Sequence, residues 1–303
     1  MRILLIAISF LFLAACQNNS SKQIQQQNQT KNGLNGVIGG DLVADKAPIS
    51  YGIVGIFDTE ENYICTGSLI SPNHVLTAAH CINPHASKMK IIFHNNLDKI
   101  IGSKNQLLVN FHQRNVTDAL VNPAYKPEEN ENKEFDLGDI AIIKFEGDLP
   151  EGYAPVEILG NDSVLQKGVD ITVAGYGVSD VYLSPVNPKK IKDLQDAIDA
   201  GEIICYDINN TDCESVDMTG DGVLRQTHVL ISSLQQTEFR LDESKGHGTC
   251  SGDSGGPAYV QVDGKLVLAG VTSRGSALCN NVGVYTTVTP YKAWIEEMMP
   301  YMN

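Results

Sequence analysis

The stretch GTCSGDSGGP, residues 248–257, decides how the rest of this 303-residue chain is interpreted. A serine is a weak nucleophile at neutral pH, so a reactive serine needs a base, an oxyanion site and a fixed geometry. Glycines on both sides of Ser254 allow the backbone to turn sharply and to approach a ligand closely. In such a turn the N–H groups of Gly252 and Ser254 can point at one spot, where a carbonyl oxygen would become negative. A plain surface loop is the alternative, and partners elsewhere in the chain decide between the two.

Two such partners lie upstream. His80 stands in the segment TAAHC, residues 77–81, directly after an apolar run. Asp139 directly precedes the apolar segment IAII, residues 140–143, as expected for an acid at the mouth of a strand. A buried carboxylate in that place could orient an imidazole and stabilise its cation. Asp136 competes for this role, but Asp139 is favoured because it adjoins the strand.

The order His80, Asp139, Ser254 resembles that of the chymotrypsin-fold (S1-type) serine endopeptidases, from about residue 37 to the C-terminus. The resemblance implies an all-β fold of two antiparallel six-stranded barrels with a C-terminal helix. Short β-runs separated by turns agree with it. It also implies hydrolysis of protein or peptide substrates through an acyl-enzyme on Ser254, without a cofactor. His80 would act as the base, Asp139 would orient it, and Gly252 and Ser254 would form the oxyanion hole.

The composition limits the partners. The formal net charge of −14 argues against binding to nucleic acid or to an anionic membrane surface. We expect a monomer.

The N-terminus predicts export. Arg2 and an apolar run make residues 1–15 a signal peptide, and LAAC, residues 13–16, resembles a bacterial lipobox in which Cys16 is lipidated. The alternative is an ordinary signal peptide cut after Ala15. Residues 16–36 are polar and form a flexible tether or pro-segment. We therefore expect a lipid anchor in a bacterial outer membrane or at the cell surface.

Seven cysteines leave six for disulfides once Cys16 is set aside. The resemblance implies two of the bridges, and the remaining two cysteines most simply pair with each other. The expected pairs are Cys65–Cys81, Cys250–Cys279 and Cys205–Cys213.

The segment VIGG, residues 37–40, resembles the activation sequence of the family. Cleavage before Val37 by an activating protease would free an ammonium that pairs with Asp253 and orders the oxyanion loop. The alternative is a glycine turn that leads into a strand, and Gly36 is unusual where the family more often has a basic residue. No cysteine lies between Cys16 and Cys65, so cleavage would also release the domain, residues 37–303, into the periplasm or medium.

An insertion at about residues 180–222 falls where the family has a loop bordering the active site. Apolar residues at helical spacing predict a short helix within 189–200. The segment DMTGDG, residues 217–222, resembles a calcium loop with Asp217 and Asp221 as ligands. His228 stands where such a loop needs a glutamate, so a solvated acidic loop is favoured over a metal site.

The substrate pocket can be compared with the family residue by residue. Gly248 stands where trypsin-like members carry an aspartate, Ser273-Arg274-Gly275 resembles the segment Ser-Trp-Gly, and Gly283 belongs to the far wall. An open, uncharged pocket that prefers apolar or aromatic side chains at P1 is expected. Arg274 in place of tryptophan is expected to favour acidic residues at the subsites beyond.

Two other functions fit the same scaffold. A catalytically silent binding protein is disfavoured because His80, Asp139 and Ser254 are all present. A serine esterase would differ in turning over small esters rather than peptides.

Overall fold

The computed structural model describes residues 37–127 and 135–302. The signal peptide, Cys16, the tether and Gly36 therefore lie outside the described residues.

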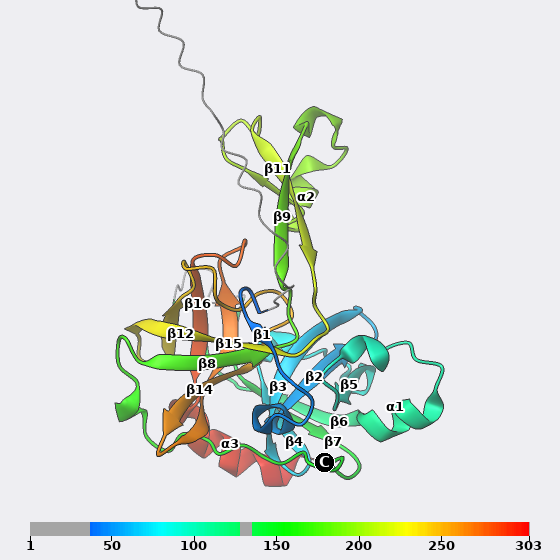
Figure 1. The fold of residues 1–303 in the computed structure, drawn as a ribbon, viewed down its shortest axis with the longest axis vertical. Helices are drawn as coiled ribbons and strands as arrows, with labels where there is room; N and C mark the ends of the chain where they lie inside the picture. The colour runs from blue at the N-terminus through cyan, green and yellow to red at the C-terminus, as the bar shows by residue number, and fades with distance from the viewer. Residues whose placement is uncertain (1–36, 128–134, 303) are drawn as a thin grey trace, which may run out of the picture. The chain divides into compact units, whose positions relative to one another are not determined.

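The first half of the chain forms a closed antiparallel barrel in the order β2-β3-β4-β7-β6-β5 (Figure 1). Each strand alternates or concentrates apolar residues, which lets one face pack inside the barrel. The strands are β2 (Ile53–Asp58), β3 (Tyr63–Ser71), β4 (His74–Thr77), β5 (Met89–Ile92), β6 (Gln113–Val121) and β7 (Ala141–Phe145).

The second half forms a sheet that closes into another antiparallel barrel because β12 pairs with β8 as well as with β13. Its six strands are β8 (Asp170–Gly175), β12 (Arg225–Leu234), β13 (Glu238–Asp242), β14 (Pro257–Val262), β15 (Lys265–Gly275) and β16 (Val282–Thr287), and β1 (Asp41–Leu42) adds to the edge of β12. The prediction of two six-stranded barrels is confirmed.

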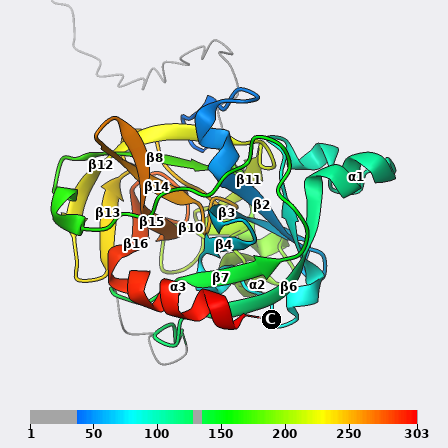
Figure 2. The same ribbon diagram turned by 90° about the horizontal axis from the view of Figure 1, so that it is seen from below.

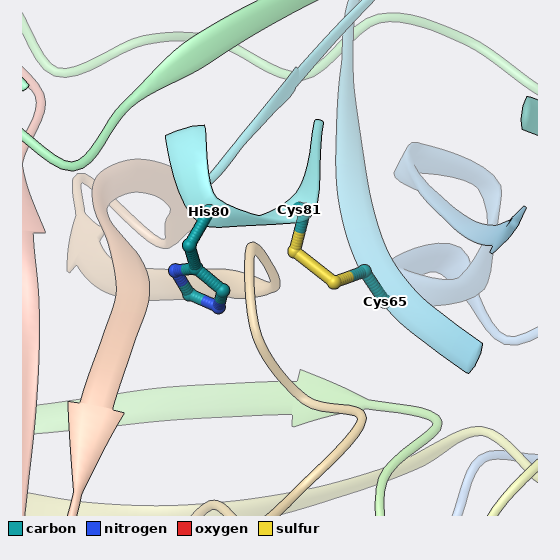
Figure 3. A group of neighbouring side chains, drawn as sticks. All are labelled: Cys65, His80 and Cys81. Atoms are coloured by element: carbon teal, nitrogen blue, oxygen red, sulfur yellow. A yellow bond between two sulfur atoms is a disulfide. The ribbon is translucent and has the colours of Figure 1, made fainter. Parts of the chain in front are cut away.

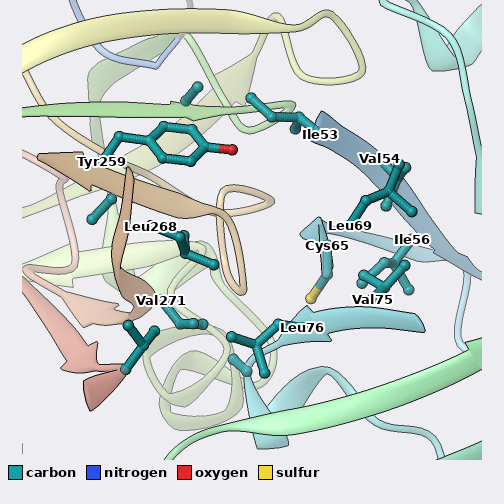
Figure 4. Close-up of a cluster of buried hydrophobic side chains, with 14 of the residues drawn as sticks. Ile53, Val54, Ile56, Cys65, Leu69, Val75, Leu76, Tyr259, Leu268 and Val271 are labelled. Carbon is teal, nitrogen blue, oxygen red and sulfur yellow. The ribbon is translucent and has the colours of Figure 1, made fainter. Parts of the chain in front are cut away.

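One continuous apolar core joins the two barrels. Figure 4 shows Ile53, Leu69 and Leu76 of the first barrel near Tyr259 and Val271 of the second, and all five are buried. Because the barrels pack through their cores, loops from both meet at the junction in fixed positions. This junction carries the predicted site.

Three α-helices complete the described fold: α1 (Gln106–His112), α2 (Leu194–Asp199) and α3 (Lys292–Met298). The C-terminal helix α3 is present as predicted, and Figure 2 shows it beside β7. Lys144 of β7 donates a hydrogen bond to the Met302 carbonyl at 2.6 Å, which fixes the end of the chain on the first barrel. No helix within residues 37–127 and 135–302 is long and apolar enough to cross a membrane.

The predicted insertion forms a sheet of its own in the order β10-β11-β9. Its strands are β9 (Asp180–Val186), β10 (Ile203–Cys205) and β11 (Cys213–Thr219), and the predicted short helix is α2. Figure 1 shows this sheet extending away from the barrel that contains β8.

Candidate active site

His80 is held by a tight turn that follows strand β4. The turn, Ala79–Cys81, is a single 3-10 turn, and Cys81 is bonded to Cys65 of β3. Figure 3 shows the imidazole of His80 beside this disulfide. The sulfurs of Cys65 and Cys81 lie near the His80 ring, but both are used by the bond between them, so these three residues are no metal site.

Asp139 lies immediately before β7 and only 4% of its side chain is exposed. Its Oδ2 is 2.8 Å from His80 Nδ1 and accepts a 2.6 Å hydrogen bond from Ser273 Oγ, while Oδ1 accepts from the His80 backbone N–H. Burial alone would raise the pKa of Asp139, but the contacts with His80 and Ser273 outweigh it and hold the pKa below its usual range. The carboxylate is therefore ionised at neutral pH. Since a carboxylate only accepts, His80 Nδ1 carries the proton and Nε2 can accept another.

The competing acid, Asp136, is used elsewhere. Its Oδ1 accepts hydrogen bonds from the backbone N–H and the hydroxyl of Thr237, at 2.6 and 2.7 Å. The structure thus brings Asp139, and not Asp136, to His80.

Ser254 is fixed between the barrels. Its carbonyl accepts a 2.8 Å hydrogen bond from Thr66 N–H of β3 and lies 3.5 Å from the Sγ of Cys81, the residue that follows His80 in the chain. Gly252 and Gly255 on either side have φ values of +93° and +79°, which L side chains rarely adopt. The glycines of the motif are therefore required by the turn that holds Ser254.

The N–H groups of this turn differ in their use. Those of Asp253, Gly255 and Gly256 donate to backbone carbonyls of the protein. Within the described parts of the chain, those of Gly252 and Ser254 make no backbone hydrogen bond. The two donors that the sequence assigns to an oxyanion are thus available to one.

The family model named Trypsin matches residues 38–295. This chain belongs to the trypsin family of serine proteases. It is 29% identical over 251 residues to a tryptase of Mus musculus, with 80% of this chain and 81% of the tryptase covered. The solved structure of mouse neuropsin, a serine protease expressed in the limbic system of the brain, superposes with a TM-score of 0.59 at 22% identity. That match covers 86% of this chain and 98% of neuropsin, and it supports the fold.

In this trypsin-family chain, Asp253 points away from solvent and is fully buried. Its oxygens accept hydrogen bonds from the N–H groups of Gly177 and Cys250, at 2.8 and 2.9 Å. Burial raises the pKa of Asp253 to about 7, although these two N–H groups and the charge of Arg225 act to lower it. Val37 is also fully buried, and the adjacent Ile38 accepts a hydrogen bond from the Gly248 N–H at 3.0 Å.

A cavity of about 190 Å³ opens beside Ser254. A wider surface hollow, of about 660 Å³, lies over residues 144–149 and contains none of the predicted site residues. The predicted pocket residues Ser273, Arg274 and Gly275 line the smaller cavity, whose other lining residues are Thr249, Cys250, Ser251, Ser254, Thr272, Ser276, Ala277 and Cys279.

The pocket was expected to have only uncharged groups around it, but Glu243 lies against two of its predicted residues, Gly248 and Gly283. A Cβ atom added at Gly248 or Gly283 would overlap the Glu243 side chain. Glu243 is fully buried, and burial raises the pKa of its carboxyl group despite hydrogen bonds from Thr249 and Tyr285. Glu243 was not predicted from the sequence because it does not stand at a position where the family carries an acid in the pocket. The available signal was an acidic residue five positions before Gly248.

Arg274 also differs from expectation. Its guanidinium donates two hydrogen bonds to the carboxylate of Glu238, at 2.9 and 2.8 Å, and Glu238 is fully buried. Arg274 Nη1 also lies 3.3 Å from Ser273 Oγ, the group that donates to Asp139. The charge of Arg274 is therefore already compensated, which removes the reason to expect acidic residues at the neighbouring subsites.

The three expected disulfides are present: Cys65–Cys81, Cys250–Cys279 beside the cavity, and Cys205–Cys213 between β10 and β11 of the insertion. The weak calcium candidates are not brought together. Asp217 belongs to β11, where it pairs with Tyr182 of β9, and Asp221 lies in the loop that follows. No cluster of acidic ligands includes either residue within the described part of the chain.

Proposed function

We propose that this chain cleaves peptide bonds through an acyl-enzyme on Ser254, with His80 as general base and Asp139 as the group that orients it. The observation that carries the proposal is the ionised Asp139 on His80 Nδ1, at 2.8 Å, together with the unused N–H groups of Gly252 and Ser254. These supply the orientation of the base and the charge stabilisation that acyl transfer requires.

In the proposed reaction, His80 Nε2 takes the proton of the Ser254 hydroxyl as its oxygen attacks the substrate carbonyl. The carbonyl oxygen becomes negative and accepts from the N–H groups of Gly252 and Ser254, each worth about 3 kcal/mol in the transition state. His80 then gives its proton to the leaving amine, and the acyl group stays on Ser254. Water hydrolyses the ester in the reverse sequence of proton transfers, with Asp139 stabilising the imidazolium in both halves.

We further propose that cleavage before Val37 activates the enzyme. Buried Val37 and the link between Ile38 and Gly248 bring the start of the domain to the loop that contains Asp253. A new ammonium at Val37 would compensate the Asp253 carboxylate, which is fully buried and has no cation hydrogen-bonded to it among the described residues. This pairing would fix the turn that presents Gly252 and Ser254. The activating protease cleaves after Gly36, so it differs from one that needs a basic residue there.

The lipid anchor on Cys16 remains a proposal that rests on the sequence alone. If it is present, cleavage before Val37 separates the domain from the membrane, since every disulfide of the described domain joins two cysteines within it. Partition between detergent and water, before and after cleavage, tests this. An active form that stays wholly with the detergent contradicts it.

The proposed activity is tested with the chain that begins at Val37, which contains both barrels, against a mixture of unmodified peptides. Mass spectrometry of the products is expected to show internal cleavage that Ser254→Ala abolishes. Hydrolysis of small esters without peptide cleavage would indicate the esterase alternative. Binding of peptides without turnover of either substrate would indicate the binding protein.

A further inference from the structure

Glu243 occupies the space that a side chain at Gly248 would need. It directly follows β13, and the chain turns back over the next five residues so that Gly248 lies against the Glu243 side chain. On the other side, Gly283 of β16 packs against the carboxyl group and could not carry a Cβ without overlapping it. The absence of side chains at Gly248 and Gly283 therefore makes room for a carboxyl group from elsewhere in the chain.

The two oxygens of Glu243 have different surroundings. Oε1 accepts hydrogen bonds from the Thr249 N–H at 2.9 Å, the Thr249 hydroxyl at 3.0 Å and the Tyr285 hydroxyl at 3.0 Å. Oε2 is buried and has no hydrogen-bond partner among the residues that the structure describes. A buried carboxylate oxygen without a donor is unfavourable, so a native protein that retains one has a reason for it.

The unpartnered oxygen lies on the side of the cavity. Oε2 is 4.0 Å from the position that a Cβ of Gly275 would take, and Gly275 lines the cavity beside Ser254. Thr249, which holds Oε1, lines the same cavity. A long side chain that enters past Ser254 would thus bring its end to the only oxygen of Glu243 that lacks a donor among the described residues.

We infer that Glu243 is the specificity-determining residue of this pocket, which takes the positively charged side chain of lysine or arginine at P1. This assignment rests on the proposed function, because the P1 side chain enters the cavity beside the same Ser254. A guanidinium or ammonium supplies the donors that Oε2 lacks, together with the charge that a buried carboxylate requires. An apolar P1 side chain would leave Glu243 Oε2 without a donor. The preference for apolar or aromatic P1 side chains, which was expected from the glycines alone, is therefore disfavoured.

The test compares peptide amides that differ only at P1, with arginine against its neutral isostere citrulline, using the chain that begins at Val37. The expected kcat/KM ratio is about a hundredfold or more in favour of arginine, because citrulline leaves the carboxylate uncompensated. In Glu243→Gln the ratio should fall to within about fivefold. Asp242→Asn is the matched control, since it removes a partly exposed carboxylate one residue away and should retain the full ratio.

Equal turnover of arginine and citrulline by the wild-type chain, or an unchanged ratio in Glu243→Gln, would overturn the inference while leaving peptide cleavage itself established. A second measurement does not depend on catalysis. In Ser254→Ala, benzamidine, an aromatic amidinium, should raise the melting temperature at concentrations where neutral benzamide has no effect, and adding Glu243→Gln should abolish this difference.

If no peptide is cleaved, the proposed function fails and the benzamidine result alone decides on the pocket. An amidinium effect that requires Glu243 supports it. Equal effects of benzamidine and benzamide contradict it. Retained thermal unfolding of each variant shows that the pocket, and not the fold, has changed.

Discussion

Replacing Arg274 by methionine tests the ion pair behind the site. Arg274 makes two hydrogen bonds of 2.8–2.9 Å to Glu238, whose side chain is fully buried and whose other described donor is the Leu137 N–H. Methionine retains apolar length but leaves the Glu238 carboxylate without its cation. Removing one partner of a buried pair typically costs about 3–5 kcal/mol. For a domain of this size, this predicts a melting temperature lower by about 6–20 °C.

The same change should reduce activity, since Arg274 Nη1 lies 3.3 Å from the Ser273 hydroxyl that donates to Asp139. The assay is thermal unfolding together with kcat/KM, with Lys167→Met as the control for loss of an exposed cation. Adding Glu238→Gln to Arg274→Met should recover most of the stability, because the uncompensated charge is then gone. A loss of stability no larger than that of Lys167→Met would refute the reasoning.

Three further predictions follow from the contacts of the site. Ser273→Ala removes a hydrogen bond that lowers the pKa of Asp139. In the dependence of kcat/KM on pH, the acid limb should therefore move to higher pH, and the maximum should fall by about tenfold to a hundredfold. An unchanged pH profile would contradict this. In the uncleaved chain the pKa of Asp253 is raised to about 7, so the folded state holds a proton that the unfolded state loses near pH 4. Stability should therefore decrease as the pH rises from about 4 to about 7, by an amount on the order of 4 kcal/mol, whereas the chain cleaved before Val37 and the variant Asp253→Asn should lack this decrease. Calcium should change the melting temperature by less than about 1 °C, since Asp217 lies in a strand; a larger rise that Asp217→Asn removes would restore the calcium site.

The fold was predictable because its signals are local. Short apolar runs such as residues 140–145 indicate strands wherever they pack, and the segments around His80 and Ser254 carry turns that depend on their own glycines and on a disulfide. The approach of His80 to Asp139 follows once the two barrels are assumed, since each residue lies at the end of a buried strand.

The electrostatics behind the pocket could not be predicted in the same way. Glu238 of β13 and Arg274 of β15 meet across the intervening strand β16, and nothing in the sequence selects this partner among the acidic residues of the chain. Glu243 reaches the pocket only because the chain after β13 folds back and because glycines at 248 and 283 leave room. The ion pair of Glu238 with Arg274 and the approach of Glu243 to Gly283 both depend on how segments that lie apart in the sequence come together in the fold.

The most direct test of the account is fluorophosphonate labelling of two purified forms, one that begins at Cys16 and one that begins at Val37, each with a Ser254→Ala control. We expect the probe to be found on Ser254 of the Val37 form, with little labelling of the Cys16 form. Equal labelling of both forms would retain the nucleophile and contradict activation at Val37. Absence of label from a folded Val37 form would contradict the central claim that Ser254 is an activated nucleophile.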